Sequence, residues 1–152
     1  MNPLLQAGNL NIAHVQSIIR GMYAVALTDG VHDTELVMMR DFYEQCARDS
    51  DALASFQDVV NTPFDSETAS GVLNTDELKQ TFLASCVFLG YADGNYSAKE
   101  RAKVKGLGTD IGLSSGQIGD IEDLVADQLM AQLAHIENLE ALKEVSGEMR
   151  SD

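Results

Sequence analysis

The chain has 152 residues, of which 45% are apolar, which is enough for one domain with a hydrophobic core. Its net charge of −14 makes nucleic acids and anionic lipids poor partners and favours cations and basic protein surfaces. Because no basic region precedes an apolar run, and no stretch reaches the ~18 apolar residues of a membrane span, we expect a soluble, cytoplasmic protein without direct membrane insertion.

Apolar residues at helical spacing predict three helices in the first half of the chain. The first helix is expected over residues 11–28 and the second over residues 34–48. Gly30 stands between them, where a residue with left-handed backbone would end the first helix. Ser50 is expected to cap a third, shorter helix that ends near Val60.

The residues from about 61 to 74 include a proline, a glycine and many Ser, Thr and Asp residues, which predict a long loop that links two halves. In the second half, Asn74 with Glu77 predicts a capping box that opens a helix, and Ser97 with Glu100 predicts another. Gly112 is expected to end the helix that Ser97 opens. Ser114 and Ser115 begin the last long helical region, and a C-terminal helix is expected over about 136–150.

No segment shows the period-2 alternation of a strand, so the expected fold class is all-α. The order of helix, Asp-Gly turn, helix, short loop and helix occurs twice, over about residues 10–60 and about 75–135. We therefore expect a single domain, residues 1–152, in which about seven helices form a compact bundle of two pseudo-symmetric helical repeats.

The turn motif itself carries an excess of carboxylates. Asp29-Gly30 is followed by Glu35, and Asp93-Gly94, 64 residues later, is followed by Glu100. Each aspartate is placed at the C-terminal end of a helix, where the helix dipole disfavours an anion by roughly 0.3–1 kcal/mol. Some interaction must offset that cost in both copies.

The residues alone leave two explanations for how the cost of an aspartate at a helix C-terminus is offset. Each aspartate could accept hydrogen bonds from free backbone N–H groups at the start of the next helix. Alternatively, Asp29, Glu35, Asp93 and Glu100 could supply oxygen ligands for Ca²⁺, Mg²⁺ or Mn²⁺. The loops are not EF-hands, because the first and third ligand positions of the second copy would be Leu89 and Tyr91.

The other reactive side chains give no stronger signal. Cys46 and Cys86 lie alone in apolar helical patterns and are expected to be reduced thiols within the core. The three histidines show no ligand spacing for zinc. No nucleophile–base pair or phosphate-binding glycine loop is present, so we expect a protein that is not an enzyme.

The pattern Ala-Asp-Gly-x-x-Ser-x-x-Glu, found within residues 91–100 and more weakly over residues 27–35, resembles the tellurite-resistance TerB family and its TerB-like relatives. This resemblance implies an all-helical, non-catalytic protein with an acidic surface that binds divalent metal. It also implies a role in tellurite or other chemical stress, with protein partners in a membrane-associated stress complex. The first copy has Asp33-Thr34-Glu35 where the pattern has Ser-x-x-Glu, so the first site departs from the family pattern.

The sequence therefore leads to two hypotheses. In the first, Asp29 with Glu35 and Asp93 with Glu100 bind divalent cations in a stress-response assembly. In the second, the protein is a metal-independent interaction module whose carboxylates only cap helices and whose acidic surface docks a basic partner.

Overall fold

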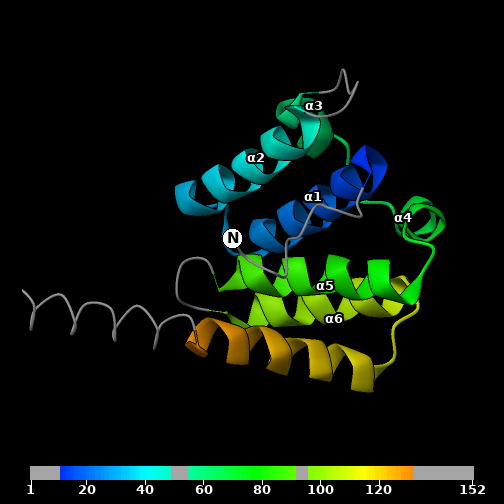
Figure 1. Ribbon diagram of the computed structural model, residues 1–152. Helices are drawn as coiled ribbons and strands as arrows, with labels where there is room; N and C mark the ends of the chain where they lie inside the picture. The colour runs from blue at the N-terminus through cyan, green and yellow to red at the C-terminus, as the bar shows by residue number, and fades with distance from the viewer. Residues whose placement is uncertain (1–10, 49–54, 92–95, 132–152) are drawn as a thin grey trace, which may run out of the picture.

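The computed structural model describes residues 11–48, 55–91 and 96–131, and this part of the chain is entirely helical and without strands (Figure 1). The all-α class expected from the sequence is confirmed. Seven α-helices and one short 3-10 helix occur in the described residues. They are α1 (Ile12–Ala26), η2 (Leu27–Asp29), α2 (Asp33–Arg48), α3 (Phe56–Asn61), α4 (Ser66–Val72), α5 (Asp76–Gly90), α6 (Ala98–Asp110) and a helix over residues 115–131.

Helices α1 and α5 form the centre of the bundle. They pack against each other, while α2 covers α1 on one side and α6 covers α5 on the other (Figure 1). The short helices α3 and α4 flank α1, and the helix over residues 115–131 lies along the outer side of the α5–α6 pair. Both central helices have 15 residues, and their first residues are 64 positions apart.

The core is made of apolar side chains on the inward faces of these helices. Gly21 of α1 lets the two central helices approach closely, because a Cβ built there would lie 2.4 Å from the ring of Phe82 on α5. Cys86 is buried beside this contact, and burial raises the pKa of its thiol well above the usual range. Cys46, expected within the core, is only half-buried and packs against it.

Several helix ends are where the sequence placed them. Ser97 caps α6 in a capping box with Glu100, and α1 begins at Ile12, one residue after the expected start of the first helix, with Asn11 as its cap. Gly30 and Gly112 have positive φ angles of 78° and 97°, which a residue with a side chain rarely adopts.

Other boundaries differ from the expectation. The segment 61–74, expected as a long loop, contains α4, which is capped by Asp65 and anchored by the buried side chains of Ala69 and Leu73. Thr75, not Asn74, caps α5, because its hydroxyl accepts from the amide of Leu78.

Helix α3 begins at Phe56 with Ser55 as its cap. The expected cap, Ser50, lies outside the described residues, as does the C-terminal helix expected over 136–150. Within the described ranges, no helix is both long enough and apolar enough to span a bilayer.

Candidate functional site

The first Asp-Gly turn joins α1 to α2 through η2. Asp29 is the last residue of η2 and is exposed to solvent, and Gly30 follows with positive φ. Glu35, in the first turn of α2, is only 1% exposed. Its Oε1 accepts a hydrogen bond of 3.0 Å from the backbone N–H of His32. This carboxylate therefore stabilises the start of α2.

The second turn joins α5 to α6. The Oε1 atom of Glu100 accepts from the backbone N–H of Ser97 at 3.0 Å, and the Oγ atom of Ser97 accepts from the backbone N–H of Glu100 at 3.1 Å. Glu100 is 3% exposed, which matches the burial of Glu35. Asp93 lies outside the described residues, so the pairing of Asp93 with Glu100 expected from the sequence stays a prediction.

The two glutamates thus act alike at two helix starts. Each satisfies a backbone donor that has no partner inside its helix, and each places a negative charge at the positive end of the helix dipole. Within residues 11–48, 55–91 and 96–131, no three His, Cys, Asp or Glu side chains are grouped so that they could hold a metal ion.

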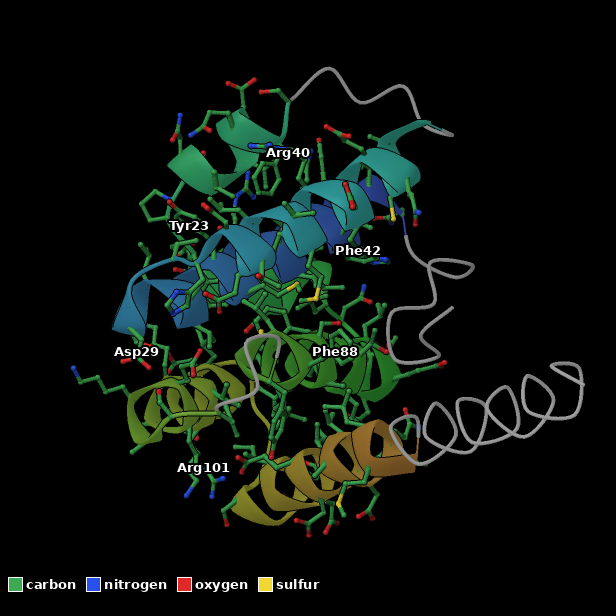
Figure 2. All side chains as sticks on the ribbon, turned by 90° about the vertical axis from the view of Figure 1, so that its left-hand side faces the viewer. Tyr23, Asp29, Arg40, Phe42, Phe88 and Arg101 are labelled. Carbon is green, nitrogen blue, oxygen red and sulfur yellow. The ribbon has the colours of Figure 1, made fainter. Side chains whose placement is uncertain are left out.

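Asp29 has a different neighbourhood from the two glutamates. Its helix η2 packs against α6, and Figure 2 shows Asp29 at the end of α1 that lies nearest α6. Helix α6 carries four cations within seven positions, at residues 99, 101, 103 and 105, all of them exposed. Exposed opposite charges on two packed elements attract each other, and this attraction opposes the unfavourable position of Asp29 at a helix C-terminus. The position of α6 beside η2 depends on tertiary packing and therefore could not be predicted from sequence spacing.

A cluster around Tyr96 closes the second turn, and sequence reasoning missed it. The ring of Tyr96 packs 5.0 Å from that of Tyr91, and the Arg101 guanidinium lies 5.1 Å from the Tyr96 ring centroid. The Arg101 Nε atom is also 3.7 Å from Oε2 of Glu122, on the helix over residues 115–131, and Figure 2 labels Arg101 on α6. Burial, and after it the charge of Glu122, raises the pKa of Tyr96. The aromatic residues on both sides of the second Asp-Gly pair were the available signal.

An acidic stripe runs along the outer face of the helix over residues 115–131. Its side chains recur at positions 120, 123, 124, 127 and 130, the spacing of one helix face. Two are apolar: Leu124 is 49% exposed and Met130 is 68% exposed. The other three are exposed carboxylates, and together the five residues are Asp120, Asp123, Leu124, Asp127 and Met130.

This acidic stripe has the chemistry of a docking surface. Two large apolar side chains offer area that water solvates poorly, and three carboxylates beside them offer charge to a basic partner. A shallow hollow of 200 Å³ adjoins the stripe and is lined in part by Gln80 of α5, Asp120 and Leu124. The sequence showed the helix but not this stripe, because which face is covered depends on how the helix packs against α5 and α6.

Comparison with known proteins adds no relative. No family model matches the chain, and neither a curated protein nor a solved structure shows significant similarity to it.

Proposed function

We propose that this protein is a non-catalytic helical interaction module that docks a basic partner through the acidic stripe. The observation that carries the proposal is the exposure of Leu124 and Met130 among three carboxylates on one helix face. A cationic amphipathic helix of a partner would match both components, since its apolar residues could cover the two side chains while its lysines face the aspartates.

The motif glutamates support the metal-independent version of this module. Glu35 and Glu100 are buried, and each already accepts a backbone hydrogen bond that closes a helix start. Capping accounts for the Oε1 atom of each of these carboxylates. The two pseudo-symmetric repeats would then provide a scaffold, and binding would use its outer faces.

The direct test is calorimetric titration with a synthetic probe. The probe is a capped 18-residue peptide with leucines along one helical face and lysines elsewhere, so its length is about 27 Å when helical. We expect saturable binding that weakens as salt is raised. Asp123→Asn/Asp127→Asn should weaken it roughly 5-fold, because exposed ion pairs contribute about 0.2–1 kcal/mol each.

Asp41→Asn/Glu44→Gln is the matched control. Like the stripe variant, it removes two negative charges, but from exposed positions on α2, which is distant in sequence from the acidic stripe. Equal weakening by both pairs would show that the peptide responds to net charge only and would overturn the proposal. Leu124→Ser adds a second readout, because it should weaken binding without changing the charge.

The alternative proposal is divalent-cation binding at the Asp-Gly turns, with Asp29 and Asp93 as the discriminating ligands. It would also fit the TerB-like resemblance and its role in chemical stress. Titration with Mn²⁺, Ca²⁺ and Mg²⁺ tests it separately from the peptide. Binding by the unaltered protein that is lost in Asp29→Asn/Asp93→Asn would support this alternative, and absence of binding would leave the carboxylates as caps and surface charges.

A further inference from the structure

A cleft on another face of the molecule has the opposite chemistry to the acidic stripe. It has a volume of 270 Å³ and lies between α1, residues 60–64 and α6. Its lining includes Arg20, Tyr23 and Leu27 from the α1–η2 segment, Phe64 from the connection to α4, and Lys103 from α6. Three segments that are far apart in the sequence therefore form it.

The cleft is positively charged within a strongly negative protein. The chain has 24 acidic and 10 basic side chains, yet Arg20 and Lys103 both line the cleft and no carboxylate of the described residues does. The Nε atom of Arg20 donates a hydrogen bond of 3.2 Å to the carbonyl oxygen of Val59. That bond holds the guanidinium at the wall of the cleft.

The remaining walls are apolar and well supported. Phe64 stacks on the buried ring of Phe82, with centroids 5.5 Å apart and an interplanar angle of 24°. Tyr23 is half-buried, and Leu27 is 56% exposed at the rim. A ligand that placed a ring or a branched aliphatic group here would cover this surface.

The cleft continues into a smaller cavity of 70 Å³, which shares Arg20 and Phe64 and reaches Ser17. Ser17 and Leu27 are ten residues apart, which is nearly three helical turns, so the combined groove is about 15 Å long. Asp65 lines the smaller cavity, but its side chain accepts from the backbone and hydroxyl of Thr68 and caps α4. A groove of this length suits an extended segment of about four or five residues.

The structure points to this groove as a binding site for a short acidic segment of a partner protein. An aromatic or large aliphatic residue of the segment would lie against Tyr23 and Phe64, and neighbouring carboxylates would face Arg20 and Lys103. The inference does not depend on the acidic stripe, which recognises the opposite charge on a different helix.

The test uses isotope-labelled full-length protein and a capped six-residue peptide with a central phenylalanine flanked by glutamates. Titration followed by amide NMR should shift resonances of residues around Tyr23, Phe64 and Lys103 in a saturable manner. Lys103→Glu should weaken binding by about 10-fold or more, since it replaces an attraction with a repulsion at the site. Lys105→Glu is the control, because this residue is exposed on the same helix and does not line the cleft.

The outcomes separate a specific groove from general charge attraction. Equal weakening by Lys103→Glu and Lys105→Glu, or equal binding of a peptide whose glutamates are replaced by glutamines, would overturn the inference. Absence of saturable shifts would overturn it as well. Arg20→Gln gives an independent check, with circular dichroism to verify the fold, and should weaken the acidic peptide while leaving the basic probe of the acidic stripe unaffected.

Discussion

The two Asp-Gly regions, residues 26–35 and 90–100, begin α2 and α6 with the same device and are packed differently. In both, a buried glutamate accepts a backbone hydrogen bond at the helix start. Beneath the first turn, Ala26 is buried and Val31 packs against the core. In the second turn, Gly90 stands 64 positions after Ala26, and Tyr96 directly precedes Ser97 just as Val31 directly precedes His32. The ring of Tyr96 lies directly against Gly90. Both turns share the glutamate cap, and they differ in the side chains that pack at the turn.

The difference shows that the second turn depends on tertiary packing more than the first. A Cβ on Gly90 would lie 2.5 Å from Cδ1 of Tyr96, a separation that packed atoms do not tolerate. Tyr96 in turn contacts Tyr91 and Arg101, and Arg101 reaches Glu122 on the helix over residues 115–131. The second turn is thus linked to three helices.

The largest effect is expected from filling the space at Gly90. Gly90→Val should lower the free energy of unfolding by about 1–3 kcal/mol, because the added atoms must displace the Tyr96 ring. At the matching position of the first turn, Ala26→Gly should cost only about 1 kcal/mol, the usual penalty of glycine in a helix. Urea denaturation followed by circular dichroism measures both.

Gly106→Ala provides the control for the glycine substitution. Position 106 lies within α6, and a Cβ there would meet nothing within 4 Å, so helix propensity alone should stabilise the protein by up to about 1 kcal/mol. If Gly90→Val were as well tolerated as Gly106→Ala, the close contact with Tyr96 would not be a packing constraint.

A smaller effect is expected at the caps. Ser97→Ala removes the hydroxyl that accepts from the Glu100 amide and should cost about 1 kcal/mol. Thermal unfolding measures the loss, and an unchanged unfolding midpoint would contradict the capping role of Ser97 at the second turn.

The features visible in the sequence were those set by neighbours along the chain. Helical periodicity located α1, α2, α5 and α6, and the Ser97–Glu100 spacing identified its capping box, since both depend on residues within one or two turns. Helix α4 was missed, because its short polar sequence has little intrinsic helical tendency and the burial of Ala69 and Leu73 stabilises it.

The candidate sites depended on contacts that spacing does not reveal. The cationic cleft combines Arg20, Phe64 and Lys103, which no local motif connects. The exposed face of Leu124 could not be distinguished from a core face by periodicity, because the same spacing describes both. The motif glutamates were found from sequence, but their burial, which favours capping, required the structure.

The smallest expected effect concerns the ionisation of Tyr96, which has no counterpart at Val31 in the first turn. Burial raises the pKa of the Tyr96 phenol, and the negative charge of Glu122 raises it further. Because the folded-state pKa lies above the unfolded value of about 10, this group favours folding below that pH, and the contribution is lost as pH rises beyond it. Glu122→Gln should lower the Tyr96 pKa slightly while leaving it raised, since burial is the larger cause. Tyrosinate absorbance measured against a Tyr96→Phe reference isolates this titration, and identical curves with and without the Glu122 charge would mean that the second turn is electrostatically independent of the helix over residues 115–131.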